Sequence, residues 1–553
     1  GDCQRFMRPV PERNEIRRLC FSAEEAFQLF PAVVNQQLRL QPEPPPGRYA
    51  QEAEQRAVAT ISRRSIVNLH HRPDPAERFT GEARLSPEGS FKGGDELGLG
   101  RHPGLLPRQD SQQFNREQRV LVYRRSEGQP DFQPFGTQFD VDTVGYETAA
   151  HSLSPKVVPE AEARTVVGGP ECKKPYSASR LNISAMSFGA LSPNAIEALN
   201  SGAKLGNFAH NTGEGGLSKY HLAGGGDIFW QIGTGYFGCR TKDGHFDPAQ
   251  FAERAKHDAV KMIEIKLSQG AKPSHGGVLP GAKVDKEIAE VRGVPIGEDC
   301  VSPPTHSTFS NPRGLLEYVV QLRELCGGKP VGFKLCVGRR SEFMGVCKAM
   351  LETGITPDFI TVDGSEGGTG AAPLEFSDRL GMTANEGLIF VHNCLVGIDK
   401  REKVKLISSG KVVNGFDMVQ KIALGADMCN AARTMLFAIG CIQAVRCNTN
   451  TCPSGVATQD WRRMRAVVVN QRKYNVANFH GENIRSFLDL VGAMGVASPD
   501  DLTPFHINRR IANETEKTYG ELYEYLEPGE LLDTSGRDNG FRKFWALAEA
   551  DTF

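Results

Sequence analysis

The apolar positions after about residue 173 fall into short runs, and most of these runs end at a glycine-rich turn. Short apolar runs bounded by such turns are typical of buried strands, and apolar residues spaced three or four apart are typical of amphipathic helices. The pattern predicts strands at residues 182–188, 262–267, 330–337, 359–363, 405–409 and 427–431. It predicts helices at residues 193–204, 314–326, 341–353, 415–424 and 434–444.

The alternation of these strands and helices indicates the fold class. Strands that alternate with helices of roughly 10–15 residues form βαβ units and a parallel sheet. Such a sheet can close into a barrel or stay open and doubly wound, and both forms bind ligands beyond the carboxyl ends of their strands. The number of units favours closure. We therefore predict an α/β fold, a (β/α)8 TIM barrel with a partly irregular N-terminal region.

The N-terminal part of the chain differs from the rest. Residues 1–115 are rich in Pro, Arg, Gln and Glu, and their only helical patterns are short ones near residues 22–30 and 51–69. This composition is typical of segments that do not bury a core, so we expect the region to be partly disordered or helical. The expected regions after it are a lead-in segment packed on the barrel at 116–180, the barrel at 181–510 with a cysteine loop at 441–452, and a C-terminal tail at 511–553.

Composition limits the classes of binding partner and the cellular compartment that we expect for this protein. The 65 basic and 66 acidic residues leave a net charge of −1, which gives no reason to expect a nucleic acid or an anionic membrane surface as a partner. No stretch reaches the roughly 20 apolar residues of a membrane-spanning helix, and the first residues lack the apolar core of a secretion signal. The 13 cysteines indicate reduced thiols or metal ligands rather than a disulfide framework. We expect a cytoplasmic protein without a membrane span.

Two consecutive loops at strand ends would suit a phosphate group. One is Ser408-Ser409-Gly410-Lys411, and the other, Ala431-Ala432-Arg433, opens a predicted helix. Late barrel loops with a helix N-terminus bind phosphomonoesters through backbone N–H groups, although a single loop of this kind is more often a tight turn without a ligand. The pair, together with the glycine-rich loop at 366–370, favours a flavin mononucleotide. No strand is followed by the G-x-G-x-x-G fingerprint of NAD or FAD sites.

A lysine interrupts one of the apolar strands. Lys334 lies within Val331-Gly332-Phe333-Lys334-Leu335. Burial of its charge is costly unless the charge is paired, so it faces either the solvent or the mouth of the barrel. A cation beside the N1/O2 edge of a flavin would stabilise the reduced, anionic form. A solvated or salt-bridged lysine is the alternative.

Three cysteines follow one another at short spacing, as Cys441-x5-Cys447-x4-Cys452-Pro453. Iron–sulfur clusters are held by cysteine thiolates, and no histidine stands at the distance that a zinc finger needs. Three ligands instead of four favour a three-iron cluster. Cysteines are also common in protein cores, and the spacing alone does not separate the two interpretations.

A further polar group would suit a substrate with two carboxylates. Lys266, Gln269 and Lys272 follow one strand, and a 2-oxo diacid needs two or more cations. Glu197 on the first barrel helix and Glu214 in a glycine-rich loop could each handle a proton or ammonium. Carboxylates on helix surfaces are, however, far more often structural than catalytic.

These stretches together resemble the FMN-binding synthase domain of glutamate synthase, and more closely the shorter, stand-alone proteins of the FMN-binding glutamate synthase family. The motifs that carry the resemblance are Ser-Ala-Met-Ser-Phe-Gly-Ala-Leu-Ser at 184–192, Asn-Thr-Gly-Glu-Gly-Gly at 211–216, Lys-Leu-Ser-Gln-Gly-Ala-Lys-Pro at 266–273, Gly-Gly-Thr-Gly-Ala at 367–371 and Cys-Asn-Thr-Asn-Thr-Cys-Pro at 447–453. The likeness runs from about residue 114 to about residue 508. Several motifs in the same order make it specific.

The resemblance implies a set of site residues. It implies that FMN is surrounded by Ala185, Met186, Ser187, Lys334, Gly367, Gly368, Gly410, Ala431 and Ala432. It implies a 3Fe-4S cluster on Cys441, Cys447 and Cys452, and catalytic roles for Glu197, Lys266 and Lys272, with 2-oxoglutarate near Lys266. The implied reaction is the reductive amination of 2-oxoglutarate by ammonia to glutamate, through 2-iminoglutarate, with hydride from reduced FMN and electrons from the cluster.

The resemblance also implies partners, and the departures from the family pattern leave alternatives. The electron donor would be external, either ferredoxin or a reductase subunit. Ammonia would come from solution or from a separate glutaminase subunit. We also expect the protein to form a homo-oligomer. The chain has His275 and Val278 where the family's long form has Glu and Gln, and its phosphate loops are poorer in glycine. An enzyme for another amine or 2-oxo acid, such as an N-methylglutamate synthase-type subunit, and a non-catalytic electron-transfer subunit remain alternatives.

Overall fold

The structure is a computed structural model, and it describes residues 114–132, 135–273, 275–533, 535–536 and 538–553. The helical patterns expected near residues 22–30 and 51–69 lie outside the described residues.

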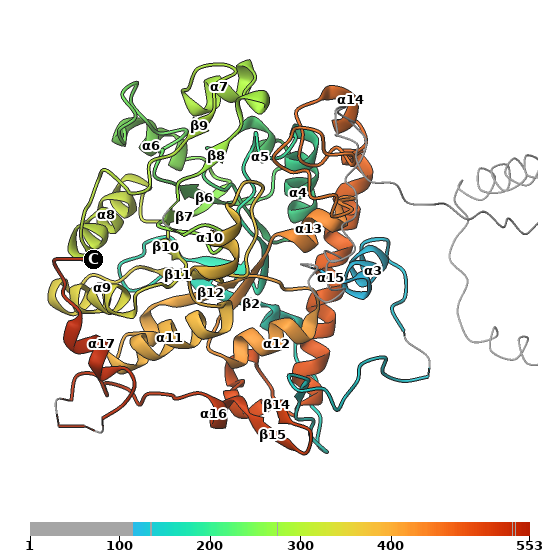
Figure 1. Cartoon of the computed structure of the whole chain (residues 1–553), viewed down its shortest axis with the longest axis vertical. Coiled ribbons are helices and arrows are strands. Elements are labelled where there is room, and N and C mark those ends of the chain that lie inside the picture. The colour runs from blue at the N-terminus through green and yellow to red at the C-terminus, as the bar shows by residue number, and fades with distance from the viewer. Residues whose placement is uncertain (1–113, 133–134, 274, 534, 537) are drawn as a thin grey trace, which may run out of the picture. The chain divides into compact units, whose positions relative to one another are not determined.

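Eight parallel strands close into a barrel, which confirms the predicted fold class (Figure 1). Around the barrel the strands follow the order β10-β11-β12-β13-β4-β5-β6-β7, so neighbours in the chain are also neighbours in space. The strands are β4 (Leu181–Ile183), β5 (Ala209–Asn211), β6 (Asp227–Ile232), β7 (Val260–Lys266), β10 (Val331–Leu335), β11 (Phe359–Asp363), β12 (Lys405–Ser409) and β13 (Met428–Ala431).

A helix follows each barrel strand. These helices are α4 (Pro193–Leu205), α5 (Lys219–Ala223), α6 (Pro248–Ala255), α8 (Pro312–Leu325), α9 (Arg340–Thr353), α11 (Ala384–Gly397), α12 (Gly415–Ala423) and α13 (Arg433–Ala438). The first of them shows why the sequence predicts such boundaries well. Ser192 caps α4 by accepting a hydrogen bond from the Ala195 N–H at 3.2 Å, and Pro193 takes the first helical position, where no N–H is needed.

The inside of the barrel is filled in two layers. Apolar side chains at the amino-terminal end form one cluster: Ala209, Phe229, Met262, Phe359, Ile407 and Met428. Because side chains alternate along a strand, Glu264 points inward one step above Met262. Its carboxylate accepts hydrogen bonds from Asn211 (2.8 Å), Gln231 (2.6 Å) and Thr361 (2.6 Å). This polar layer separates the apolar floor from the open end.

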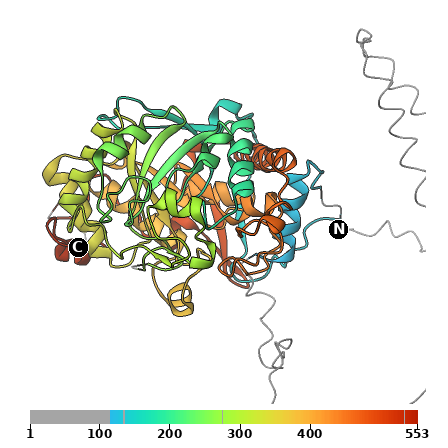
Figure 2. The same cartoon turned by 90° about the horizontal axis from the view of Figure 1, so that it is seen from above.

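Further segments surround the barrel. Strands β2 (Arg164–Val167) and β3 (Tyr176–Ser179) pair antiparallel and contribute Val167 and Ala178 to the apolar floor. The long helix α15 (Val469–Ala493) packs against α4, α12 and α3 (Arg116–Ser126). Figure 2 shows the orange-red α15 beside the blue α3. The other elements are β1 (Glu147–Ala149), β14 (Ile507–Ala512) and β15 (Thr515–Thr518), which form a small antiparallel sheet, and the short helices α10 (Leu374–Arg379), α14 (Trp461–Met464), α16 (Tyr519–Leu522) and α17 (Arg542–Leu547).

An insertion between β7 and α8 matters for the site. It contains the strand pair β8 (Val278–Leu279) and β9 (Cys300–Val301), a 3-10 turn η5 (Gly281–Lys283) and helix α7 (Lys286–Arg292). Helix α7 begins where the Asp285 side chain accepts from the Ile288 N–H at 2.9 Å, and it ends at Gly293, which has a left-handed φ of 65°.

The structure corrects some predicted boundaries. The strand expected at 182–188 ends at Ile183, and the helix expected at 434–444 ends at Ala438. Gly440, with a φ of 102°, follows that helix, and left-handed conformations recur at Gln443 and Val445, so the chain cannot continue as a helix there. Strands β5 and β6 were not among the predicted strands.

In the part of the chain that the structure describes, no helix combines the length and apolarity needed to cross a membrane.

Candidate active site

A cavity of about 250 Å³ opens at the carboxyl ends of the barrel strands. Most of the predicted site residues line it: Ala185, Met186, Ser187, Lys266, Lys272, Lys334, Gly367, Gly368, Gly410, Ala432, Cys441, Cys447 and Cys452. Two predicted residues do not. Ala431 is the buried last residue of β13, one position before the lining residue Ala432, and Glu197 lies half-buried on α4. Its predicted catalytic role stays a prediction.

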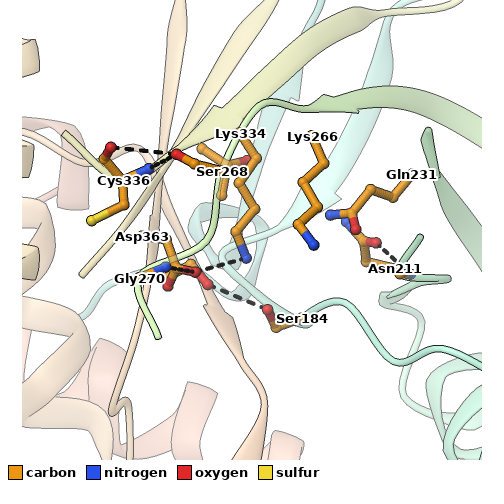
Figure 3. A network of polar contacts seen from close by, with 12 residues as sticks. Ser184, Asn211, Gln231, Lys266, Ser268, Gly270, Lys334, Cys336 and Asp363 are labelled. Atoms are coloured by element: carbon orange, nitrogen blue, oxygen red, sulfur yellow. Dashed lines mark hydrogen bonds and ion pairs between the residues drawn. The ribbon is translucent and has the colours of Figure 1, made fainter. Parts of the chain in front are cut away.

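Lys334 forms a buried ion pair with a residue of the neighbouring strand (Figure 3). Its Nζ lies 3.2 Å from Oδ2 of Asp363, and the backbone N–H of Gly270 donates to the same carboxylate oxygen at 3.1 Å. Burial works against a charged lysine, but Asp363 and Glu264 outweigh it and raise the pKa of Lys334 above its ordinary value. Lys334 is therefore a salt-bridged cation that lines the cavity, and its role beside a flavin stays a prediction.

A second ion pair lies beside the first. Nζ of Lys266 is 2.7 Å from Oε1 of Glu214, and both side chains are largely buried. Burial opposes ionisation of Glu214, but Lys266, Arg292 and Lys272 together lower the pKa of its carboxyl group. Glu214 is thus an ionised carboxylate held among cations. The loops that bear these groups approach closely, as Gly277 and Gly233 both face the Glu214 side chain.

Lys272 differs from the other two lysines because its hydrogen bond goes to a neutral group. Its Nζ donates to the carbonyl oxygen of Gly276 at 2.8 Å, and the side chain is almost fully buried. Burial lowers the pKa of Lys272, and the Glu214 carboxylate opposes that effect. The lining includes six cationic side chains, Lys266, Lys272, Arg292, Lys334, Lys411 and Arg433, and three carboxylates, Glu214, Asp363 and Glu366. This excess of positive charge suits an anionic ligand.

The two loops expected to hold a phosphate lie on the same cavity. Ser409, Gly410, Lys411, Ala432 and Arg433 all line it. Gly410 has a φ of 149° and Lys411 a φ of 39°, so the chain turns sharply as it leaves β12. A side chain placed on Gly410 would meet only the Cβ of Ala384, at 3.7 Å, which leaves open space in front of this backbone. These features fit the phosphate and ribityl chain of a bound FMN.

The three predicted cysteines, in the loop that follows α13, line the cavity, and two of them are anchored by distant side chains. The hydroxyl of Tyr123 donates to the Cys441 carbonyl at 2.7 Å, and Nζ of Lys283 donates to the Cys447 carbonyl, also at 2.7 Å. Cys452 Sγ lies 3.4 Å from the Ser454 hydroxyl. Burial raises the pKa of the Cys441 thiol, whereas hydrogen bonds from Ser454 and nearby backbone outweigh burial and lower the pKa of Cys452.

The donor set fits an iron–sulfur cluster, but not a single metal ion. Within the described residues, no group of three or more His, Cys, Asp or Glu side chains is arranged to hold one ion. A multi-iron cluster is wider than one ion, and cysteine thiolates are its usual protein ligands, so three separate thiols around one cavity are a suitable set.

Several residues of the site were not singled out from the sequence. Asp363 was predicted only as the last residue of a strand, and nothing in the sequence gives reason to expect Arg292, Lys283 or Tyr123 at the site. Arg292 and Lys283 belong to the insertion after β7, and Tyr123 belongs to α3. No local pattern distinguishes them from surface residues, because their partners lie far away in the sequence.

Sequence comparison with known proteins identifies the family of this chain. Residues 137–497 match the family described as "Conserved region in glutamate synthase". The chain is 42% identical over 344 residues to the glutamate synthase large subunit-like protein YerD of Bacillus subtilis (strain 168), a match that covers 62% of this chain and 65% of that protein. It is 31% identical to the archaeal-type glutamate synthase [NADPH] of Thermotoga neapolitana, over 58% of this chain and 60% of that protein.

A third relative is much longer. The ferredoxin-dependent glutamate synthase of Cyanidium caldarium is 35% identical over 56% of this chain, but only 20% of that protein is covered. The chain thus spans less than two thirds of the length of each of these relatives. Among solved structures, a mandelate oxidase with (S)-2-phenylpropionate aligns over 72% of this chain and 98% of its own, at 14% identity and a TM-score of 0.36. The match over residues 137–497 shows that the chain belongs to the family defined by the conserved region of glutamate synthase.

Proposed function

We propose that the chain is an FMN-dependent oxidoreductase of the glutamate synthase type, which converts 2-oxoglutarate and ammonia into glutamate through 2-iminoglutarate. The observation that carries this proposal is that one cavity contains both a set of buried cations and the three cysteines. Family membership and the names of the relatives support the same reaction class.

FMN would lie across the mouth of the barrel. Ala185, Met186 and Ser187 would contact the flavin ring, and Gly410 and Ala432 would lie beside its phosphate. When bound, FMN supplies hydride transfer from N5. Lys334 would place its positive charge at the pyrimidine edge of the ring, where charge influences the redox balance of a flavin.

Two of the other lysines in the cavity would bind the substrate. A 2-oxo diacid has two carboxylates, and Lys266 and Lys272 are two buried ammonium groups at one end of the cavity. Glu214 touches Lys266 and is ionised, so it can hold an ammonium ion or accept a proton close to the substrate. Glu197 does not line the cavity, and Glu214 is for this reason the better candidate for that role.

The cysteines would hold a 3Fe-4S cluster. Cys441, Cys447 and Cys452 would each provide one thiolate, and the cluster would pass single electrons from an external donor. That donor is ferredoxin or a reductase subunit in this proposal, and ammonia comes from solution or from a separate glutaminase subunit.

The proposal is tested with protein purified without oxygen. We expect bound FMN by mass spectrometry, iron and sulfide in the cluster ratio, and glutamate when dithionite, 2-oxoglutarate and ammonium are supplied. Cys447→Ser should lose the iron and keep the FMN, whereas Cys239→Ser, at a buried cysteine outside the cavity lining, should keep both. Protein that is free of flavin, or that makes no product from any 2-oxo acid, would contradict the proposal.

A second candidate substrate is favoured by one residue. Val278, in the insertion, is an apolar residue that lines the same cavity as the cations. An apolar contact suits an N-alkyl group better than ammonium. The same assay with methylamine instead of ammonium therefore distinguishes an N-methylglutamate synthase-type enzyme by its methylated product.

A further inference from the structure

Lys283 holds together three segments that are far apart in the sequence. It is the last residue of the 3-10 turn η5 in the insertion after β7, and only 2% of its surface is exposed. Its Nζ donates to the carbonyl oxygens of Ala190 at 2.9 Å, Cys447 at 2.7 Å and Ala457 at 2.9 Å. Ala190 belongs to the loop after β4, and the other two belong to the cysteine loop and the stretch that follows it.

The hydrogen bonds favour the protonated form of this side chain, although burial lowers the pKa of Lys283 to about 8. Three carbonyl acceptors at hydrogen-bond distance need three N–H donors, and only an ammonium group has three, since a neutral amine has two. Lys283 is thus a buried cation, although its contacts are neutral carbonyl groups.

This charge has no carboxylate partner in the part of the chain that the structure describes. The ion pairs found there do not include Lys283, and the nearby guanidinium of Arg292 has the same sign of charge. A buried charge without a counter-charge is strongly unfavourable. The groups of opposite sign that can lie near it are the thiolates of the cysteine loop, because its Nζ contacts the backbone of Cys447 itself.

We propose that Lys283 is a positioning residue for the three-cysteine site, which fastens the Cys447 loop and supplies the buried positive charge that balances an anionic, thiolate-ligated cluster. This inference rests on the iron–sulfur cluster proposed above. It assigns two separable effects to one side chain: the hydrogen bonds hold the loop in place, and the charge favours the more negative, reduced state of the cluster.

The structure provides a control that separates these effects. Tyr123 anchors the Cys441 carbonyl at 2.7 Å as Lys283 anchors that of Cys447, but the donor of Tyr123 is a neutral hydroxyl. Tyr123→Phe removes an anchor without changing the charge. Lys283→Gln removes the charge and keeps an amide with two donors, and Lys283→Met removes both.

The experiment uses the full chain, purified without oxygen and reconstituted with ferrous iron and sulfide. Iron and sulfide per chain are quantified, the midpoint potential of the cluster is measured by a redox titration followed by electron paramagnetic resonance, and circular dichroism checks the fold. We expect Lys283→Gln to retain a cluster with a lower midpoint potential, Lys283→Met to lose much of its iron, and Tyr123→Phe to keep the wild-type potential.

The outcomes separate this inference from the function it rests on. If wild-type protein binds no iron, the cluster proposal fails and this inference fails with it. If wild-type protein binds a cluster and Lys283→Gln has the same potential and iron content, only the role of Lys283 is overturned. An equal shift in Tyr123→Phe would overturn the charge effect. If Lys283→Met does not fold, Lys283→Gln alone decides the question.

Discussion

Lys334 of β10 and Asp363 of β11 form an ion pair of 3.2 Å in the lining of the cavity, and both side chains are buried. In the register of the two strands Lys334 lies opposite Thr361, so Asp363 is the diagonal neighbour two residues further along. This pairing lets a charged lysine stay inside an apolar strand, because its partner offsets the cost of burial. The cation is thereby held in the lining of the cavity.

The first prediction concerns that lysine. Lys334→Met should lower the midpoint potential of bound FMN, because it removes a positive charge beside the place expected for the reduced flavin. It should also destabilise the fold by about 3–5 kcal/mol, since Asp363 stays buried without its cation. A photometric redox titration and urea unfolding measure the two effects. Lys261→Met, at the opposite end of the neighbouring strand β7, is the control. An unchanged flavin potential would place Lys334 away from the ring.

The second prediction separates binding from chemistry at the other ion pair. Lys266→Met should raise the KM for 2-oxoglutarate by about 10- to 100-fold, the effect of losing one hydrogen bond to a charged group. Glu214→Gln should instead lower kcat, because the amide cannot accept a proton. Steady-state kinetics with a chemical reductant distinguish the two variants. If both variants changed only KM, Glu214 would have no part in proton transfer.

The third prediction concerns a close approach of two loops. Gly270 lies against Gly364, and a Cβ at position 270 would overlap the carbonyl oxygen of Gly364. Gly270→Ala should therefore push apart the loops after β7 and β11, cost about 1–3 kcal/mol or more and weaken FMN binding. Gly338→Ala, in the exposed loop after β10 where a Cβ meets nothing within 4 Å, should change the unfolding free energy by less than about 0.5 kcal/mol. Equal effects of the two substitutions would contradict this packing.

The fourth prediction is a pH dependence of stability. His480 stacks on Phe208, its Nε2 lies 3.0 Å from the Ser179 hydroxyl, and burial lowers the pKa of this histidine to about 3. Between pH 3 and the unfolded pKa of about 6.5 the unfolded chain binds the extra proton, so stability falls as the pH decreases through this window. The slope from one such histidine is at most about 1.4 kcal/mol per pH unit.

The measurement for His480 is the unfolding free energy at several pH values between 4 and 7. His480→Gln should be less stable than wild type at pH 7. Its unfolding free energy should also fall less steeply on acidification, because unfolding of the variant takes up as much as one proton fewer. A variant with the wild-type pH dependence would show that His480 does not titrate in this way.

The sequence by itself determined the alternation of strands and helices, the closed barrel and the strand-end loops that meet at one face. These features depend on local periodicity and on turn residues, which each segment contains within itself. The short strand β5 escaped detection because three residues are too few to show a period. Tertiary structure decided which charges meet. The pairing of Lys334 with Asp363, the hydrogen bonds of Lys283 and Tyr123 to the cysteine loop, and the position of Glu197 outside the cavity lining depend on contacts between segments far apart in the sequence, and no local pattern encodes such contacts.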